Sequence, residues 1–396
     1  MCAIGIVLGS RAAPVKRINP PGAQAASMLP PMKAVELSLL LISAYASLNL
    51  IRSSIGFLRL PRVKEGERGN RRVSIVIPAR NEEERITECL ELALSKLGES
   101  DELIVVNDCS NDLTEVRAME RLDGRCKLIT LLQKPPGWTG KSWACYQGYL
   151  HSSGDVIVFL DADTRLLGDL DGAISLTEEY DAVSQVPRIA CGSIACGAVE
   201  IALTSLIRLL QPYWRMDDER AWLAGAFMVW RRESYESIGT HASVRRSLVE
   251  DAELARLAVR MGMRVSFFLG GVAESRWMGS WSEAYGAIKR ISLGACVGRN
   301  ASIAALLLLT YTAIITYLSP LMALLGHLDP AMAIIYLASI LSYASLSLVE
   351  VRTSPLAFLL APLALPLIGL ASLRARGRSE VGWKGRVYSA AEEGAK

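Results

Sequence analysis

The chain has 396 residues, with 43 Lys and Arg against 40 Asp and Glu, and 51% of its residues are hydrophobic. This length and a charged fraction of 21% exclude a disordered polypeptide, a coiled coil and a disulfide-stabilised miniprotein. The nearly balanced charge provides no long basic face, so nucleic acid is not expected as a partner. The apolar content favours a protein that is partly embedded in a membrane.

The first predicted elements separate membrane segments from a soluble part. Residues 1–33 are rich in proline and lack the pattern of a secretory signal, so they are predicted to be disordered. Apolar runs near the length of about 20 residues that a bilayer span needs occur at 34–51, 301–328, 331–349 and 355–373. The sequence therefore predicts an anchor at 34–51, a soluble domain at 52–300, a membrane bundle at 301–373 and a basic tail at 374–396.

Strand-like and helix-like runs alternate through the first half of the soluble domain. The predicted strands are 73–77, 103–106, 128–132 and 156–160, and the predicted helices are 82–97, 113–122, 142–151 and 166–180. This alternation predicts an α/β fold with a parallel sheet, in which ligands bind at the carboxyl ends of the strands.

Polar turns follow three of these strands. They are the turn formed by Pro78, Ala79, Arg80, Asn81 and Glu82, the turn from Asn107 and Asp108 to Asp112, and the turn from Asp161 to Asp163. A single acidic turn is ordinary, because Asp and Asn favour turns and helix caps. Three at successive strand ends would gather carboxylates at one sheet edge, where they could bind something cationic.

The pair Asp161 and Asp163 could offer oxygen ligands to Mg²⁺ or Mn²⁺ and leave positions open for phosphate oxygens. This suits a nucleotide diphosphate, with Asp108 accepting hydrogen bonds from the base or ribose and residues 78–82 framing the nucleotide. Lys141 is a candidate contact to the diphosphate, although a solvated Lys at a helix start is nearly as good an interpretation. Neither G-x-G-x-x-G nor G-x-x-x-x-G-K-[ST] occurs, which weighs against a dinucleotide enzyme or a P-loop ATPase.

Six motifs in this order resemble the family 2 glycosyltransferases with the A-type fold. They are VSIVIPARNEEERI, ELIVVNDCSND, PPGWTGKSWACYQG, VIVFLDADT, LAGAFMVWRRESY and LVEDAELARLAVRMG. The GWTGKSW run, the apolar C-terminal bundle and the closing WKGRVY are most similar to the membrane-bound subgroup associated with carotenoid and hopanoid glycosylation. The resemblance implies a nucleotide-diphospho-sugar transferase domain between transmembrane helices.

The resemblance also implies a role for individual residues. Asp108 would contact the nucleotide base, Asp161 the ribose or donor sugar, and Asp163 the divalent metal. Asp251 would be the general base, although acids in the first turn of a helix are also favoured by its dipole. The residues implied on the acceptor side are Gly225, Glu250, Arg276 and Trp277.

These expectations describe an inverting hexosyltransferase that uses a nucleotide sugar, expected to be a UDP-sugar, and a lipid or isoprenoid acceptor. The alternatives are a nucleotidyltransferase and a polysaccharide synthase of the same family. Processive synthases carry Q-x-x-R-W, and here Ala273 stands where the Gln would be, ahead of Arg276 and Trp277. Transfer of a single sugar is therefore favoured.

The membrane topology is predicted from charge and from apolar runs. The absence of a C-x-x-C pair favours free thiols in a reducing compartment, and hence a catalytic domain facing the cytoplasm from the plasma membrane. Residues 189–214 are apolar apart from Glu200 and Arg208, and they are predicted to form an amphipathic helix on the membrane surface. Residues 355–373 contain three prolines, so this segment is expected to be re-entrant or interfacial.

Overall fold

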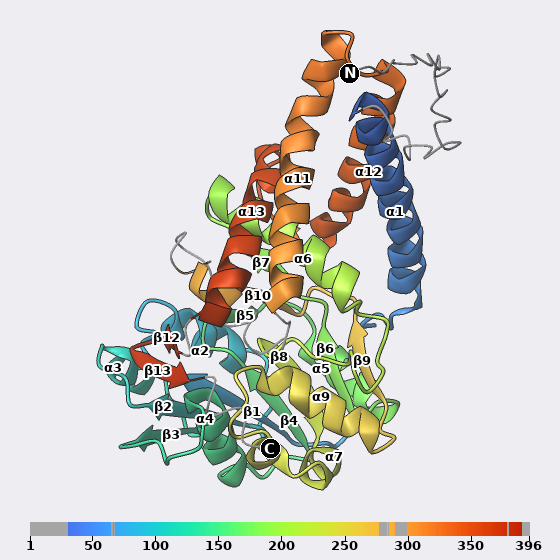
Figure 1. The fold of residues 1–396 in the computed structure, drawn as a ribbon. Coiled ribbons are helices and arrows are strands. Elements are labelled where there is room, and N and C mark those ends of the chain that lie inside the picture. The colour runs from blue at the N-terminus through green and yellow to red at the C-terminus, as the bar shows by residue number, and fades with distance from the viewer. Residues whose placement is uncertain are drawn as a thin grey trace, which may run out of the picture.

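The computed structural model describes residues 31–64, 66, 68–276, 283, 285–289, 299–377 and 380–389. They form a sheet domain, a group of long apolar helices on one side of it, and a C-terminal β-hairpin that lies back against the sheet domain (Figure 1).

The centre of the sheet domain is a seven-stranded mixed sheet with the order β3-β2-β1-β4-β8-β6-β9. Its strands are β1 (Val73–Ala79), β2 (Glu102–Asp108), β3 (Cys126–Leu131), β4 (Val156–Leu160), β6 (Ala182–Gln185), β8 (Phe227–Arg231) and β9 (Val265–Phe268). Strands β1 to β4 are parallel, which confirms the predicted half of the sheet. Strand β8 is antiparallel to both β4 and β6 and was not predicted.

Helices cover both faces of this sheet, which explains why its central strands are continuous apolar runs. One core contains buried side chains of α2 (Ile86–Leu94), α3 (Thr114–Met119) and α5 (Leu170–Ser175). The other contains side chains of α4 (Gly140–Leu150), α7 (Arg232–Ser237) and α9 (Glu250–Arg260), near the short α8 (Thr240–Ser243). The order of the predicted β-α-β units is confirmed.

The prediction of one helix over residues 166–180 is wrong. This segment contains the end of β5 (Thr164–Leu166), then α5, then the 3₁₀ helix η1 (Leu176–Glu178). The chain breaks at Gly168, where an added Cβ would lie 2.6 Å from the Gly271 carbonyl oxygen. The side chain of Asp169 then caps α5 by accepting a 3.0 Å hydrogen bond from the Gly172 N–H.

A second sheet joins the sheet domain to the helical part. Its order is β11-β7-β10-β5, with β7 (Ile189–Ala190), β10 (Ala273–Ser275) and β11 (Val351–Arg352). Strand β11 pairs with β7 just before the last long helix begins. The chain therefore returns to the sheet domain before that helix.

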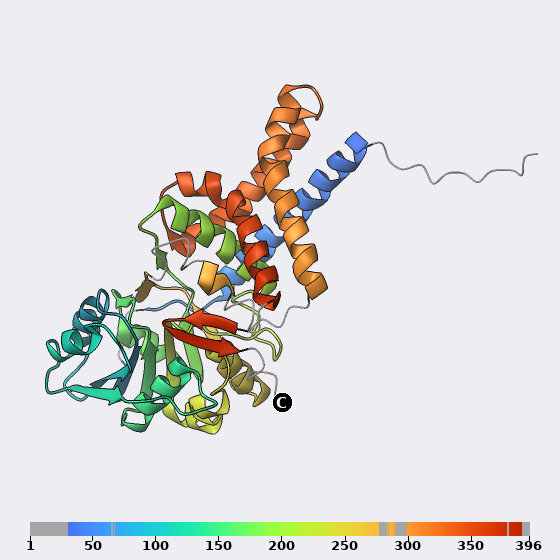
Figure 2. The ribbon, with the colours of Figure 1, turned by 60° about the vertical axis from the view of Figure 1, so that its left-hand side comes forward.

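The long helices are α1 (Pro31–Arg59), α11 (Arg299–Leu324), α12 (Pro330–Ser345), which continues into η2 (Leu346–Val349), and α13 (Leu356–Gly377). Within the described residues, four segments are long and apolar enough to cross a membrane: Lys33–Arg59, Ile303–Leu324, Pro330–Val349 and Leu356–Arg374. Helices α1, α11 and α12 project away from the sheet domain, whereas α13 lies closer to it (Figures 1 and 2). Helix α13 is continuous through Pro362 and Pro366.

The predicted helix within residues 189–214 is α6 (Ile194–Leu210), but its setting differs from that of a surface helix. It packs against α13, and both Glu200 and Arg208 are buried. The guanidinium of Arg208 pairs with the carboxylate of Glu350, which also accepts a hydrogen bond from the Tyr213 hydroxyl. The charge of Arg208 is thus neutralised inside the protein.

Candidate active site

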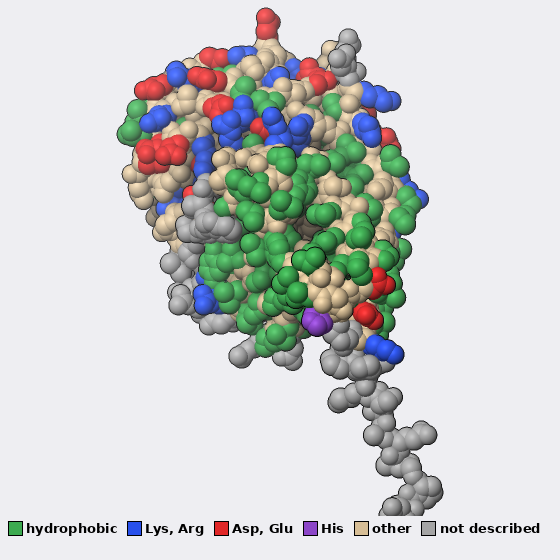
Figure 3. Space-filling view, turned by 90° about the horizontal axis from the view of Figure 1, so that it is seen from above, with side chains coloured by type: hydrophobic (Ala, Val, Ile, Leu, Met, Phe, Trp, Pro, Cys, Tyr) green, Lys and Arg blue, Asp and Glu red, His purple; other side chains and the backbone are tan. Residues whose placement is uncertain are grey.

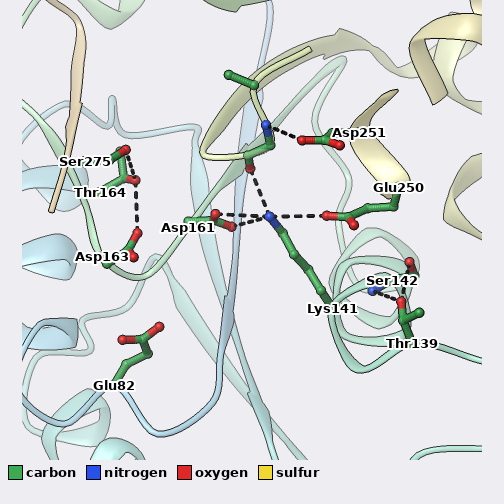
Figure 4. Close-up of polar contacts among 12 residues, drawn as sticks. Glu82, Thr139, Lys141, Ser142, Asp161, Asp163, Thr164, Glu250, Asp251 and Ser275 are labelled. Atoms are coloured by element: carbon green, nitrogen blue, oxygen red, sulfur yellow. Dashed lines mark hydrogen bonds and ion pairs between the residues drawn. The ribbon is translucent and has the colours of Figure 1, made fainter. Parts of the chain in front are cut away.

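The predicted acidic turns meet at one edge of the main sheet. Asp108 ends β2, Glu82 follows β1, and Asp161 and Asp163 directly follow β4. Strands β2, β1 and β4 are adjacent and parallel, so these turns lie side by side. Figure 4 shows Glu82, Asp161 and Asp163 around this edge, with Lys141, Glu250 and Asp251 beside them.

Lys141 joins the sheet edge to α9. Its Nζ lies 2.7 Å from Asp161 Oδ1 and 3.3 Å from Glu250 Oε1, and it donates a 3.3 Å hydrogen bond to the Gly225 carbonyl. Burial lowers the pKa of Lys141, but the charges of Asp161 and Glu250 outweigh this effect and hold the pKa above its usual value. Lys141 therefore stays charged, and Glu250 lies in this ion-pair cluster. The sequence did not predict this cluster.

Asp251 lies in the first turn of α9, held by two backbone N–H groups. Its Oδ2 accepts a 2.9 Å hydrogen bond from Gly225, and its Oδ1 accepts a 2.8 Å hydrogen bond from Ala252. Burial and the charge of Glu250 raise the pKa of Asp251 to about 6, with Lys141 acting in the opposite direction. The side chain is thus ionised at neutral pH, with a pKa well suited to accepting a proton.

The backbone of Gly225 lies between the side chains of Asp251 and Lys141. Its N–H contacts Asp251 and its carbonyl contacts Lys141. An added Cβ would lie 2.8 Å from Asp251 Oδ2 and 3.1 Å from Lys141 Nζ. No side chain fits here unless Asp251 moves.

We therefore expect Gly225→Ala to displace Asp251 and to lower catalytic activity by about 10- to 100-fold, the effect of misplacing a reacting group by about 1 Å. The fold should be retained, because Gly225 is buried but the atoms nearest the added methyl group belong to the side chains of Asp251 and Lys141 and not to the backbone. Steady-state rates and thermal unfolding of Gly225→Ala and of Gly124→Ala, where an added Cβ meets nothing within 4 Å, would test this. Equal rates for the two variants would contradict the prediction.

Asp163 faces Glu82 across the sheet edge. One oxygen of Asp163 accepts a long hydrogen bond of 3.4 Å from the Thr164 hydroxyl, which also bonds Ser275 at 3.0 Å. Burial and the charge of Asp161 raise the pKa of Asp163. Burial likewise raises the pKa of Glu82 to about 7, with the charge of Asp163 adding to this and Lys384 opposing it. Burial, together with an acidic neighbour, therefore disfavours the charged form of each carboxylate, which a cation at this edge would stabilise.

Within the described residues, no three or more His, Cys, Asp and Glu side chains form a group that could enclose a metal. Mg²⁺ and Mn²⁺ are commonly held by one or two carboxylates together with substrate phosphates rather than by a protein cage. The carboxylate of Asp163 and the buried carboxylate of Glu82, each with a raised pKa, fit this kind of open site.

The turn after β1 is held mainly by contacts with β2 and with the residues that follow β2. Pro78 and Ala79 belong to β1 and pair with Val106 and Asn107 of β2. Asn81 has a positive φ of 54°, an unfavourable backbone conformation for residues other than glycine that is often found at functional sites. Arg80 donates hydrogen bonds of 2.6 and 2.7 Å to the carbonyls of Asp108 and Cys109. Arg80 thus fixes the ends of β1 and β2 together.

Two residues that the sequence interpretation did not assign to the site come from the C-terminal hairpin, which consists of β12 (Glu380–Trp383) and β13 (Arg386–Ser389). Arg386 forms a bidentate ion pair with Asp108, and the distance from its Nη2 to Asp108 Oδ1 is 2.9 Å. Lys384 pairs with Glu82, and its carbonyl accepts a 2.9 Å hydrogen bond from Arg80. The signal for these residues was the WKGRVY motif near the end of the chain.

The remaining predicted acceptor-side residues lie after β10. The Arg276 N–H donates a 3.2 Å hydrogen bond to the Asp163 carbonyl, and its guanidinium pairs with Glu88 at 3.2 Å. Trp277 lies outside the described residues. Ala273, at the position of the Gln in the processive motif, is buried in β10.

The model of the family described as Glycosyl transferase family 2 matches residues 74–200. In this region the chain is similar to the family 2 glycosyltransferases. The match spans β1 to β4, the turns that follow them and the first part of α6, so the predicted family resemblance is confirmed.

Two curated relatives carry the name 4,4'-diaponeurosporenoate glycosyltransferase. The protein from Staphylococcus haemolyticus is 35% identical over 131 residues, which cover 32% of this chain and 34% of that protein. The protein from Staphylococcus aureus strain MRSA252 is 28% identical over 206 residues, which cover 50% of this chain and 54% of that protein. The match thus spans about half or less of each relative.

A solved structure shares the overall fold. It is the mannosyltransferase PcManGT from Pyrobaculum calidifontis in complex with GDP-Man and Mn²⁺, with a TM-score of 0.52 and 18% sequence identity. The alignment covers 87% of this chain and 98% of that one. The predicted A-type glycosyltransferase fold with flanking apolar helices is confirmed.

Proposed function

We propose that this protein is a membrane-anchored inverting glycosyltransferase that moves a sugar from a nucleotide-sugar donor to a hydrophobic acceptor. The observation that carries this proposal is the position of Asp251 across from Asp163 at the sheet edge, with Lys141 and Asp161 between them (Figure 4). This leaves a proton acceptor on one side and a diphosphate-binding region on the other. The names of the staphylococcal relatives and the nucleotide sugar in PcManGT support the same reaction class.

In the proposed reaction, Asp251 takes the proton of an acceptor hydroxyl as that oxygen attacks the anomeric carbon of the sugar. A new carbon–oxygen bond forms, and the bond from the anomeric carbon to the phosphate oxygen breaks. The nucleoside diphosphate leaves with the electron pair of that bond. Attack from the side of Asp251, opposite the leaving group, inverts the anomeric centre.

The donor side is proposed to use the sheet-edge residues. Asp108 would accept hydrogen bonds from the base, Asp161 would contact the ribose or sugar, and Lys141 would hold Asp161 in place. Asp163, with Glu82 beside it, would hold Mg²⁺ or Mn²⁺, an ion that stabilises the negative charge of the departing diphosphate when bound. The proposed donor is a UDP-sugar.

An acceptor that is a lipid or isoprenoid would reach the site from the helical side. In the view of Figure 3, apolar side chains cover much of the helical part of the molecule, and Lys and Arg side chains gather where it meets the rest. Large side chains exposed on the long helices include Leu41, Leu48, Leu307, Ile334 and Leu363. Such a surface supports an enzyme that lies at a membrane with basic residues near the lipid headgroups.

Two contacts of the chain support the proposal that α13 is re-entrant or interfacial. Before α13, β11 pairs with β7, and after it Arg386 pairs with Asp108. Both ends of α13 thus connect to parts packed on the sheet domain, on one side of the membrane. Only α11 and α12 would then form a complete hairpin across the bilayer.

We expect single cysteines placed at Asp329 and Ser379, in a variant without native cysteines, to label differently in intact cells. The thiol of Asp329→Cys should react from outside, because this position lies in the turn between α11 and α12. The thiol of Ser379→Cys should react only after permeabilisation, because this position follows α13 in the chain. Labelling of both from outside would mean three complete spans and would overturn the re-entrant assignment.

The test of the proposed activity is to incubate membranes containing the full chain with a panel of radiolabelled nucleotide sugars and Mn²⁺. Label should pass into the organic phase, with release of a nucleoside diphosphate. Membranes carrying Asp251→Asn provide the matched control. Release of pyrophosphate from nucleoside triphosphates, without sugar transfer, would instead identify a nucleotidyltransferase.

A further inference from the structure

The C-terminal hairpin follows the long apolar helices and brings the chain back to the sheet domain. After the sheet domain is complete, the chain passes through α11, α12 and α13 and then returns as β12 and β13 to the edge formed by β1 and β2. Figure 1 shows β12 and β13 near β2 and α3, and the carbonyl of Lys384 in the hairpin turn accepts a hydrogen bond from Arg80. Its Lys384 and Arg386 are separated from their partners by 302 and 278 residues.

Both contacts of this hairpin are made to acids of the proposed donor site. Arg386 pairs with Asp108 through two nitrogen atoms, and Lys384 pairs with Glu82. The side chains of Asp108 and Glu82 are only 5% and 7% exposed. A buried carboxylate is costly without a partner, so the ion pairs with the hairpin stabilise both acids.

The turn geometry gives an independent reason to assign a role to Lys384. Lys384 and Gly385 connect the two strands, with φ angles of 43° and 76°. Such two-residue turns favour Asn or Gly at the first position, because a side chain such as Lys is unfavourable at positive φ. A Lys occupies this position despite the backbone cost, and its side chain pairs with Glu82. Arg80 fixes the same turn by donating to the Lys384 carbonyl.

We propose that Lys384 and Arg386 are donor-site residues that exchange these carboxylates for the phosphate oxygens of a bound nucleoside diphosphate. This inference rests on the proposed function and adds a diphosphate clamp to it. Phosphate oxygens accept two-pronged hydrogen bonds from a guanidinium as carboxylates do. The exchange would free Asp108 for the base and would bring two positive charges to the leaving group.

The inference predicts that the effect of each substitution depends on the phosphates of the ligand. Competition binding to the full chain in detergent, with Mn²⁺, would compare UDP and GDP with uridine and guanosine. For Arg386→Ala and Lys384→Met, affinity for the diphosphate should fall at least tenfold, while affinity for the nucleoside stays equal or rises. Arg386→Lys should lose less than Arg386→Ala, because it keeps the charge but not the two-pronged geometry.

The control is Arg121→Ala, which removes an exposed ion pair with Glu91. It should leave diphosphate affinity unchanged, and thermal unfolding would show that all variants are folded. Unchanged or tighter diphosphate binding in Arg386→Ala would overturn the clamp and would mean that Arg386 only blocks Asp108. Equal losses for diphosphate and nucleoside would also overturn it, in favour of a structural role. If the unsubstituted protein binds neither UDP nor GDP, the proposed function itself fails.

Discussion

Asp251→Asn should lower kcat by about 10² to 10⁴ while the dissociation constant for nucleoside diphosphate stays nearly unchanged, since this is the usual contribution of a positioned general base. The amide keeps the shape of the side chain but does not accept the acceptor's proton. Donor binding should persist, because Asp251 contacts Gly225 and Ala252 rather than the turns after β1, β2 and β4. Single-turnover rates and equilibrium nucleotide binding would separate the two effects.

The same residue predicts the pH dependence of the reaction. Burial and Glu250 raise the pKa of Asp251 to about 6, and only the ionised form accepts a proton. With saturating donor, the rate should therefore be half-maximal near pH 6, level off about one pH unit above this value and fall about tenfold per pH unit well below it, a decline that Asp251→Asn should lack.

A matched control is Glu253→Gln on the same helix. The carboxylate of Glu253 pairs with Arg256 at a distance of 2.8 Å and is not part of the Lys141 cluster. It should keep both the rate and its pH profile. If Asp251→Asn lost donor affinity but kept its rate, Asp251 would belong to the donor site and another group would be the base.

The part of the fold that could be predicted is the part in which local pattern and tertiary structure agree. Strands β1, β2 and β4 are buried on both faces, so each is a continuous apolar run followed by a polar turn. Strand β8 was not predicted, although its residues belong to the LAGAFMVWRRESY motif. Its pairing with β4 and β6 depends on neighbours far away in sequence.

The site shows the same division. Asp108, Asp161 and Asp163 follow strands and could be found from that rule, whereas the roles implied for them came from the family resemblance. The ion pairs of Arg386 with Asp108 and of Lys384 with Glu82 join residues that are far apart in the sequence. A local sequence pattern does not predict such pairs. The ion pair between Lys141 and Glu250 was not predicted. It joins α4 to α9, and these two helices belong to separate sequence motifs.

Asp163→Ala should abolish metal-dependent nucleotide binding and reduce turnover to background. In the folded protein, Asp163 is raised in pKa by burial and by Asp161, so it is a carboxylate whose charged form needs a cation. Removing it would leave the diphosphate without the carboxylate proposed to hold its ion, and Glu82 alone would not replace it. The measurement is UDP and GDP binding with and without Mn²⁺, together with sugar transfer.

The control is Asp171→Ala, which removes a half-exposed carboxylate on α5 that pairs with Arg68 at 3.3 Å. Its nucleotide binding should still increase when Mn²⁺ is added. Asp163→Ala should retain the fold, and its thermal unfolding should no longer shift upward on addition of Mn²⁺ with UDP or GDP. If Asp163→Ala kept the response to Mn²⁺ and its turnover, the ion would be held elsewhere. The acidic pair after β4 would then serve the sugar or the ribose rather than the metal.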